Sequence, residues 1–262
     1  MLFDTHAHYY TQAFDADRDA VLSSLPENGV GLVMCPGTDL PSCRQSIELA
    51  ERYPFLYAAV GIHPEDALGL PEDWLEQVRE MTKHPKVKAI GEIGLDYYWK
   101  EVPRDLQREV FRAQLALAKE LDLPVIVHDR EAHADCLAIV KDFPGVRGVF
   151  HCYSGSAEDA KTLVKLGWHL SFTGTITFKN ARKAPEVIAA VPMERLMVET
   201  DAPYMAPTPY RGKRCDSRYV YRMAETIAEI KGLTREEVER ITTENGMRLF
   251  DIPAPEVLEG GI

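Results

Sequence analysis

Residues 106–128 read LQREVFRAQLALAKELDLPVIVH and contain the unit that decides the fold. The first part, Leu106–Leu121, has the period of an amphipathic helix, and one stripe of that helix carries Phe111, Leu115, Ala118 and Leu121. The run Pro124–Val127 that follows is short and apolar, as expected of a buried strand. Alternation of such helices and strands is typical of α/β proteins with a parallel sheet.

The same alternation extends from end to end of the chain. Short apolar runs predict eight strands, over Leu2–Thr5, Gly31–Cys35, Leu56–Gly61, Val87–Gly91, Pro124–Val127, Gly148–Phe150, Trp168–Phe172 and Leu196–Glu199. Amphipathic segments predict helices over Asp15–Leu25, Pro41–Arg52, Pro71–Thr82, Leu106–Leu121, Glu131–Lys141, Ala157–Leu166, Lys183–Ala190 and Ser217–Ile230. The capping box Thr234-Arg235-Glu236-Glu237 begins an additional C-terminal helix that extends to about Leu249.

Eight strand–helix alternations in 262 residues predict a (β/α)8 TIM barrel, which typically takes about 250 residues. A doubly wound open sheet is the alternative, although no Gly-x-Gly-x-x-Gly follows the first strand, as a dinucleotide-binding sheet would require. We expect a single domain over residues 1–252. Proline and glycine punctuate residues 253–262, so we expect that tail to be frayed.

The composition limits where the protein acts and what it binds. Hydrophobic residues make up 45% of the chain, and no apolar run approaches the roughly 20 residues of a membrane span. The five cysteines are odd in number and contain no Cys-x-x-Cys pair, which favours a reducing compartment. Because no signal-like segment precedes the first strand, we expect a cytoplasmic protein with no membrane partner. The formal net charge of −11 opposes general binding to nucleic acid, and no protein partner can be deduced.

Potential metal ligands follow the strands. His6 and His8 are spaced as i and i+2 after the first apolar run, so both imidazoles are expected on one face. Further candidates end or follow the fourth, fifth, sixth and eighth strands, namely Glu92, His128, His151 and Asp201. Parallel barrel strands deliver their carboxyl ends to one face, where such enzymes keep their active sites. Convergence of these side chains predicts a metal centre.

Four histidines and two carboxylates exceed the four ligands of one tetrahedral zinc and suit two divalent ions better. Glu92 is expected to bridge them, because it leaves the fourth strand between the two groups of ligands. A metal pair activates water and stabilises the attacking and leaving oxygens of a phosphoester displacement. The ligand types admit Zn, Mn or Mg.

Several motifs together resemble the TatD-type metal-dependent deoxyribonucleases, the TatD-related hydrolases of the amidohydrolase-like superfamily. They are Asp4-Thr5-His6-Ala7-His8, Gly61-Ile62-His63-Pro64, Gly91-Glu92-Ile93-Gly94-Leu95-Asp96-Tyr97, Pro124-Val125-Ile126-Val127-His128, His151-Cys152-Tyr153-Ser154-Gly155, Glu199-Thr200-Asp201-Ala202-Pro203-Tyr204 and Pro209-Tyr210-Arg211-Gly212-Lys213-Arg214. The resemblance covers essentially the whole chain in the same order. It implies one metal held by His6, His8, Glu92 and Asp201, and a second held by Glu92, His128 and His151.

The resemblance also implies phosphodiester hydrolysis on DNA, commonly as an exonuclease, with His63 near the substrate. Alternatively, His63 is a strand-end histidine capped by Pro64. We expect a metal-activated water to attack phosphorus, Asp201 to orient or deprotonate that water, and Glu92 and Glu199 to complete the catalytic group. Glu199 either organises the site or is a rim carboxylate in a hydrogen bond.

Basic and aromatic residues at the predicted mouth suit a DNA partner, including single-stranded ends. Loops 178–183 and 210–214 are basic, and Arg211 and Arg214 are expected to contact phosphates. Tyr153 is one of several tyrosines after strand ends that can stack on unpaired bases or cover the rim. Together with His63, these form the expected substrate-binding set.

Two departures from the family pattern affect the expectations. Cys215-Asp216-Ser217 stands where the family usually has Asn-Glu-Pro, which makes substrate preference less secure than metal binding. Asp129 precedes Arg130 where a Ser or Thr is usual, and we expect it to cap the following helix rather than alter the local field. Three histidines are expected to be ordinary surface or helix residues, namely His84, His133 and His169, and Cys152 is expected in the core.

Two other functions compete with the nuclease. A dinuclear barrel can also hydrolyse a small phosphoester, an amide or a lactone, because the same metal chemistry serves all three. A non-catalytic metal-binding protein is disfavoured by the complete ligand set, since degeneration usually removes a ligand.

Overall fold

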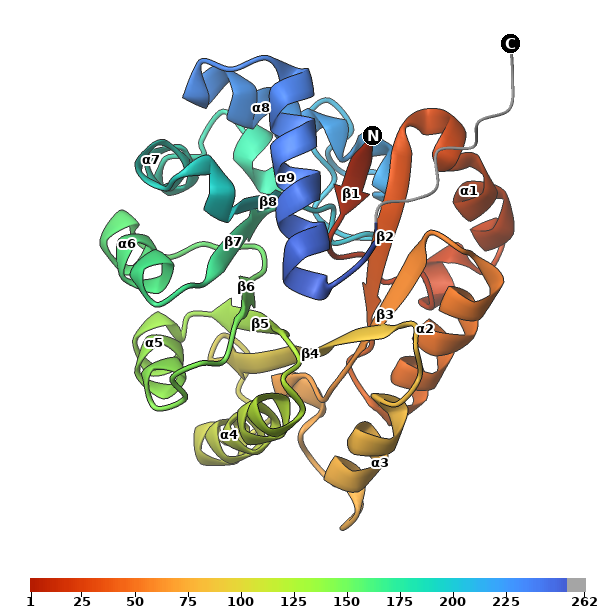
Figure 1. Cartoon of the computed structure of the whole chain (residues 1–262), viewed down its shortest axis with the longest axis vertical. Helices are drawn as coiled ribbons and strands as arrows, with labels where there is room; N and C mark the ends of the chain where they lie inside the picture. Colours follow the sequence, from red (N-terminus) through yellow and green to blue (C-terminus); the bar gives the residue numbers. More distant parts are fainter. Residues whose placement is uncertain (254–262) are drawn as a thin grey trace.

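The computed structural model describes residues 1–253, which form a (β/α)8 barrel as predicted (Figure 1). Eight parallel strands follow one another around a single sheet: β1 (Leu2–Asp4), β2 (Val30–Pro36), β3 (Leu56–Val60), β4 (Val87–Asp96), β5 (Val125–Arg130), β6 (Gly148–Phe150), β7 (His169–Phe172) and β8 (Leu196–Val198). The helices are α1 (Arg18–Ser24), α2 (Leu40–Arg52), α3 (Trp74–Met81), α4 (Arg104–Leu121), α5 (His133–Lys141), α6 (Ala157–Lys165), α7 (Lys183–Ala190), α8 (Tyr221–Lys231) and α9 (Arg235–Phe250).

The seam between β8 and β1 closes at the carboxyl ends of these strands. The amide of Thr5 donates to the carbonyl of Val198 at 3.2 Å. Beyond the regular strands, the amide of Asp201 donates to the His6 carbonyl at 2.9 Å, and the amide of His8 donates to the Ala202 carbonyl at 2.7 Å. These bonds place the histidines that follow the first strand beside the carboxylate that follows the last.

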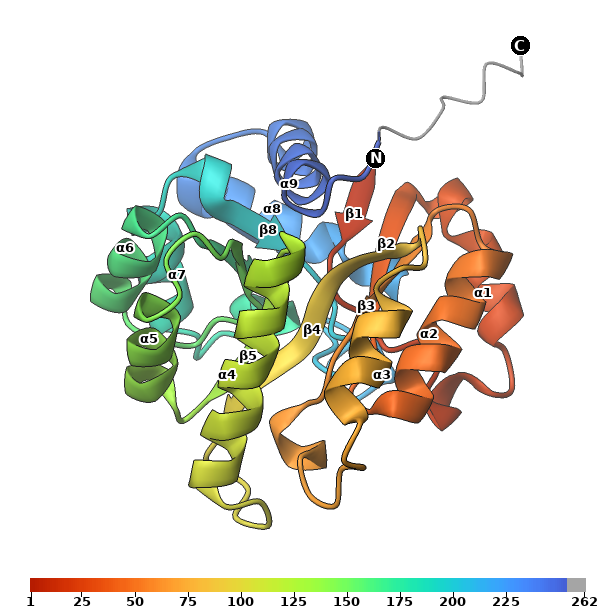
Figure 2. The ribbon, with the colours of Figure 1, turned by 60° about the horizontal axis from the view of Figure 1, so that its bottom comes forward.

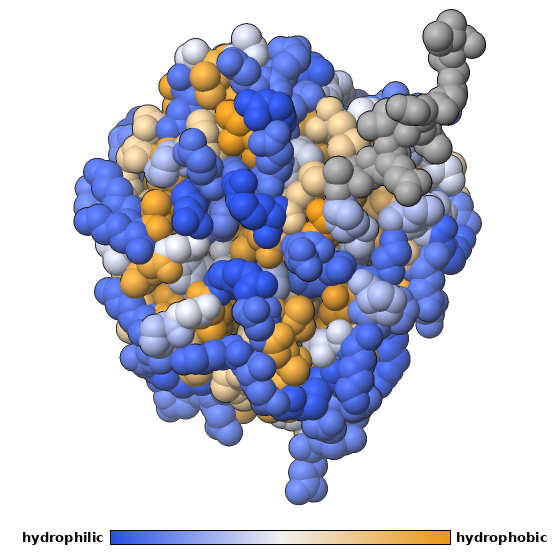
Figure 3. Space-filling model, in the orientation of Figure 1, coloured by the Kyte–Doolittle hydropathy of each residue, from blue (hydrophilic) through white to orange (hydrophobic). Residues whose placement is uncertain are grey.

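The opposite end of the barrel is plugged by α9. This helix begins with the predicted capping box of Thr234 and Glu237 and crosses the barrel opening (Figure 1). Inward-facing residues of the strands and the end of α9 form one cluster: Phe3, Leu32, Met34, Ala59, Ala89, Ile126, Val149, Met197, Leu249, Phe250 and Ile252. On the face seen in Figure 3, hydrophobic residues are interspersed among hydrophilic ones. Because α9 closes this end of the barrel, the open mouth lies at the other end, where the strands have their carboxyl ends.

The fourth and fifth strands run further than the sequence predicts. β4 continues past Gly91 to Asp96, and its pairing with β5 extends to Asp96↔Arg130. Glu92 and His128 therefore lie within strands, whereas the sequence alone predicted that they lie at strand ends. The extension requires a glycine at 94, where φ is +147° and a Cβ would lie 2.0 Å from the His128 carbonyl oxygen.

Other boundaries shift by short distances. The helix expected from Ser217 begins at Tyr221, because residues Ser217–Tyr219 form a 3-10 turn. Within residues 1–253, no helix is long and apolar enough to cross a membrane. The predicted frayed tail lies outside the described residues, apart from Pro253.

Candidate metal centre

Glu92 lies at the centre of a cluster of imidazoles at the barrel mouth. The carboxylate is 3% exposed, so its neighbours rather than water must balance its charge. Its Oε2 lies 3.1 Å from His6 Nε2 and 3.5 Å from His8 Nε2. Its Oε1 faces a second set at 2.7, 2.8 and 3.4 Å, formed by His128 Nδ1, His151 Nε2 and His63 Nε2. The two oxygens thus face two different groups of histidines.

Asp201 joins the group on the first of these sides. Its Oδ1 lies 3.4 Å from His8 Nε2 and 3.8 Å from His6 Nε2. The residue has a φ of 56°, in the left-handed region, and its amide is held by the His6 carbonyl. This turn after β8 aims the carboxylate across the barrel seam.

The donor atoms fit divalent cations. His6 Nε2 lies 3.0 Å from His8 Nε2, and His128 Nδ1 lies 3.2 Å from His151 Nε2. Neutral imidazoles whose ring nitrogens crowd a shared carboxylate form the nitrogen and oxygen donor set of a transition metal. Three overlapping groups have ligand atoms within 4.8 Å of one another: His6, His8 and Glu92; His63, Glu92 and His128; and His6, His151 and Glu199.

The electrostatics of the cluster differ from ring to ring: burial lowers the pKa of His6 and His63, whereas nearby carboxylates raise the pKa of His8, His128 and His151. Burial alone would raise the pKa of Glu92, but His151, His6 and His63 hold it well below its usual range. Burial would lower the pKa of His128, but its hydrogen bonds to Asp96 and Glu92 raise that pKa to about 9. A metal ion that binds His128 would therefore have to displace a proton from its ring.

Asp96 is a residue that the sequence analysis did not assign. Its Oδ2 lies 3.0 Å from His128 Nε2, which turns the Nδ1 edge of that ring towards Glu92. The signal was present in the sequence, because Glu92 and Asp96 are four residues apart and share one face of an extended strand. It was missed because the strand was expected to end at Gly91.

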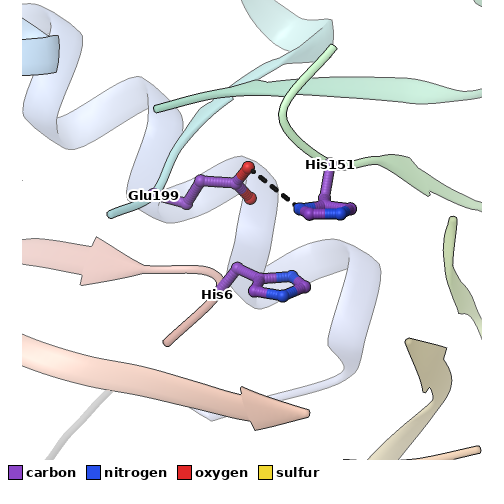
Figure 4. Close-up of side chains that lie close together, drawn as sticks. All are labelled: His6, His151 and Glu199. Atoms are coloured by element: carbon purple, nitrogen blue, oxygen red, sulfur yellow. Dashed lines mark ion pairs between the residues drawn. The ribbon is translucent and has the colours of Figure 1, made fainter. Parts of the chain in front are cut away.

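Glu199 directly follows the eighth strand, and its carboxylate points towards the ring of His151 (Figure 4). The carboxylate is fully buried, and its Oε1 lies 3.5 Å from His151 Nδ1 and accepts a hydrogen bond from the Cys152 amide at 2.6 Å. The His6 ring stacks on His151 with centroids 4.1 Å apart. Glu199 is therefore placed to orient His151 and is not a rim carboxylate.

The expected substrate-binding residues are in different environments. His63 lies inside the imidazole cluster, and its Nδ1 accepts from the Glu65 amide at 3.2 Å. Tyr153 is buried, and its hydroxyl donates to the Ser156 carbonyl at 2.9 Å, so its ring does not face the mouth. Arg211 is exposed, with its guanidinium carbon 4.4 Å from the centre of the Phe178 ring.

Arg214 is held against the segment that precedes α1 and is not free to meet a substrate. Its guanidinium donates to both carboxylate oxygens of Asp17 at 2.7 Å and to the Ala13 carbonyl at 2.7 Å. The group also lies over the Phe14 ring at 4.5 Å. These contacts indicate that Arg214 fixes the loop that carries Arg211.

Two expectations about other polar residues were wrong. Asp129 does not cap α5, because it lies in β5 and its Oδ2 pairs with His133 Nδ1 at 2.7 Å. His169 is not a surface residue, because it begins β7 and is buried beside Arg195. Burial, followed by the charge of Arg195, lowers its pKa to about 4. By contrast, His84 is near the surface beside Glu51, as expected. Cys152 is only partly buried rather than in the core, and it contacts Thr173 outside the metal-donor groups.

A family model described as TatD related DNase matches residues 3–251. The chain belongs to this family. The protein YabD of Bacillus subtilis, named an uncharacterized metal-dependent hydrolase, is 47% identical over 254 residues, covering 96% of this chain and all of YabD. The crystal structure of YjjV, a TatD homologue of Escherichia coli K12, superposes with a TM-score of 0.90 at 34% identity, covering 96% of this chain and 98% of YjjV.

A third TatD relative carries a more specific name. A Klebsiella pneumoniae protein named 3'-5' ssDNA/RNA exonuclease TatD is 32% identical over 260 residues, covering 96% of this chain and 98% of its own. Membership of the TatD family, with full-length relatives named as hydrolases, makes this chain a metal-dependent hydrolase.

Proposed function

We propose that the protein is a deoxyribonuclease that removes nucleotides from DNA ends by hydrolysing phosphodiester bonds with two divalent metal ions. The observation that carries the proposal is the division of donors around Glu92, with separate groups of imidazoles on its two oxygens. The exonuclease name of the Klebsiella pneumoniae relative supports this substrate class.

The ligands would be those implied by the family motifs. His6, His8, Glu92 and Asp201 would hold one ion, and Glu92, His128 and His151 would hold the other. When bound, the ions supply an activated water and neutralise the negative charge of the phosphate. Zn, Mn and Mg each suit part of this mixed donor set.

The protein's own groups would complete the reaction. Burial alone would raise the pKa of Asp201, but the hydrogen bond to His8 and the charges of His6 and His8 lower it. An ionised Asp201 at the mouth would take up a proton from the attacking water. Glu199 would keep His151 oriented, and Asp96 would do the same for His128.

Basic groups outside the cluster would bind the DNA backbone. Arg211 is exposed on the loop after β8, next to Phe178 in the basic loop 178–183. These charges are local exceptions on an acidic protein, as a site for phosphates requires. His63 would contact the substrate from within the cluster, because its ring edge faces Glu92 and it lies in the loop that follows β3.

The test is cleavage of end-labelled single- and double-stranded oligonucleotides after chelation and after repletion with Zn, Mn or Mg. We expect no cleavage after chelation, recovery with at least one metal, and products that shorten progressively from one end. His128→Ala should lose metal and activity, while His84→Ala, a histidine far from the mouth, should retain both. Cleavage by protein shown to be metal-free would overturn the proposal.

Hydrolysis of a small phosphoester, amide or lactone is the second candidate, and it requires the same metals. A substrate panel separates the two functions. Rapid hydrolysis of a small ester by protein that leaves every oligonucleotide intact would assign the site to that alternative.

A further inference from the structure

Two large aromatic side chains are exposed directly after β4. Tyr98 is 46% exposed and Trp99 is 45% exposed, and their rings meet edge to face with centroids 4.9 Å apart. The guanidinium carbon of Arg130 lies 4.0 Å from the centre of the Tyr98 ring and 5.9 Å from that of Trp99. We call these three residues the aromatic platform. Exposed rings of this size lose hydrophobic stabilisation unless a ligand covers them.

One carboxylate ties the platform to the metal centre. Asp96 Oδ1 accepts hydrogen bonds from the amides of Tyr98 at 2.9 Å and Trp99 at 3.2 Å, while its Oδ2 lies 3.0 Å from His128 Nε2. The platform is therefore positioned by the same side chain that orients a proposed ligand. The connection from β4 to α4 projects at the lower edge of Figure 2.

The cation of the platform is available for an anion. Among residues 1–253, Arg130 makes no side-chain hydrogen bond or ion pair, whereas Arg108, in the helix that follows the platform, pairs with Asp105 and Asp135. Arg130 is exposed and lies two residues after His128. A guanidinium held on aromatic faces keeps its N–H groups free to donate in its own plane.

A cavity of about 310 Å³ adjoins the platform. Its lining consists of Glu65, Trp99, Glu101, Val102 and Gln107. The two carboxylates would repel a phosphate but accept hydrogen bonds from the amino groups of a nucleobase, while the indole offers a flat apolar surface. This chemistry suits a base inside the cavity and a phosphate outside it, beside Arg130.

We propose that the aromatic platform binds one unpaired nucleobase, stacked on Trp99, with the adjoining phosphate held by Arg130. The proposal rests on the proposed nuclease function and narrows its substrate to single-stranded ends, because a base inside a duplex already stacks on both sides. Asp96 would link the bound base to the metal centre, because its carboxylate contacts both the Trp99 amide and the His128 ring.

A double-mutant cycle between protein and substrate tests this directly. One single strand has natural bases, and a matched strand has abasic nucleotides at both ends, with every phosphate retained. Trp99→Leu should lower kcat/KM on the natural strand by roughly 5- to 150-fold, the range expected for one stacked base. On the abasic strand the same substitution should change kcat/KM by less than about twofold, because the stacking partner is already missing.

The matched control is Tyr53→Leu. Tyr53 also carries an arginine on its face, with the Arg52 guanidinium carbon 5.6 Å from the ring centre, but it follows α2 and precedes β3, away from the mouth. This variant should cleave both strands like the wild type. Equal loss on both strands in Trp99→Leu, or no loss on either, would overturn the platform while leaving the nuclease function intact.

A binding measurement separates failure of the platform from failure of the nuclease function. The same cycle is measured as Kd on metal-loaded protein, by anisotropy, with strands that carry hydrolysis-resistant phosphorothioate linkages. If the wild type does not cut the natural strand, the nuclease function fails, and the Kd cycle alone decides the platform. Weaker binding of only the natural strand by Trp99→Leu supports it, and parallel Kd values for both strands overturn it.

Discussion

The carboxylate of Asp4 accepts two hydrogen bonds from Thr200, one from its amide at 2.8 Å and one from its hydroxyl at 2.6 Å. Asp4 ends β1, and Thr200 lies between Glu199 and Asp201 beyond β8. Both residues are fully buried, and burial raises the pKa of Asp4 to about 7 despite these bonds. This contact closes the barrel seam where two residues of the proposed site emerge.

Asp4→Ala should destabilise the protein and lower its activity together. The substitution leaves the Thr200 amide without its acceptor, which costs about 1–3 kcal/mol, and it frees the segment that carries Asp201. Thr200→Val keeps the amide bond to Asp4 but removes the hydroxyl, which donates to Asp4 and also accepts a longer bond from the Ala202 amide at 3.2 Å, and it should cost less. In urea denaturation of the metal-loaded protein, the double variant should lose less stability than the sum of the single losses, because both remove the same contact. Strictly additive losses would show that the two residues act independently.

Glu92→Gln should empty both metal positions. A neutral amide cannot balance cations on two sides, and it replaces one acceptor oxygen with an N–H group facing the imidazoles. We expect a loss of turnover of roughly 100-fold or more. Elemental analysis of the purified variant checks the metal content. Glu186→Gln, at an exposed position in α7, is the matched control and should retain full metal content.

Asp201→Asn should separate chemistry from metal binding. Asp201 contacts only the His6 and His8 side of the cluster, so the His128 and His151 side should keep its ion. Turnover should nevertheless fall, because an amide cannot accept the proton of the attacking water. Metal content and kcat are measured on the same preparation. Loss of all metal from Asp201→Asn would instead make this residue a ligand on which the whole centre depends.

Protons and metal should compete at His128. The pKa of His128 is raised from 6.5 in the unfolded chain to about 9 in the folded protein. Protonation of this ring therefore stabilises the metal-free fold, fully below pH 6.5, and the stabilisation is lost as the pH rises through about 9. Chelated protein should therefore become less stable over this range. Metal binding requires the neutral ring, so its affinity should rise over the same range, by up to about tenfold per pH unit for each proton displaced.

Calorimetry in buffers of different ionisation enthalpy measures the protons released, and thermal melts of chelated protein measure the stability. Asp96→Asn removes the negative charge that stabilises the protonated His128 ring, so the changes in stability and in metal affinity should occur at lower pH. His84→Ala is the control that should leave it in place. A metal affinity that stays constant between pH 6.5 and 9 would contradict the protonated state assigned to His128.

The sequence predicted the barrel and the proposed ligands, because apolar periodicity and polar residues that follow apolar runs are local signals. Asp96 was not assigned because its role depends on how far β4 runs, which the pairing with β5 determines. The burial of Tyr153 depends on the neighbouring Phe150 and His133, and the Asp4–Thr200 contact spans nearly the whole chain. Contacts of this kind are set by tertiary packing and leave no pattern in either segment alone.

Arg211 and Arg214 lie three residues apart in one basic loop, yet they should behave differently. The Arg214 guanidinium is held by Asp17 and lies over Phe14. Arg214→Ala should therefore lower the melting temperature and reduce activity on every substrate. Arg211 is exposed and, among residues 1–253, has no ion-pair partner, so Arg211→Ala should leave the melting temperature unchanged.

The effect of Arg211→Ala should appear only on a polymeric substrate. Losing one phosphate contact should weaken binding of an oligonucleotide and reduce the logarithmic salt slope by roughly one unit or less. A small chromogenic phosphodiester has no extended backbone, so its hydrolysis should be nearly unaffected. Binding across a salt series, the small-substrate rate and the melting temperature are measured for both variants. If Arg211→Ala lowered all three together, the exposed guanidinium would have a structural role like that of Arg214, and the phosphate contact would have to come from the basic loop 178–183 instead.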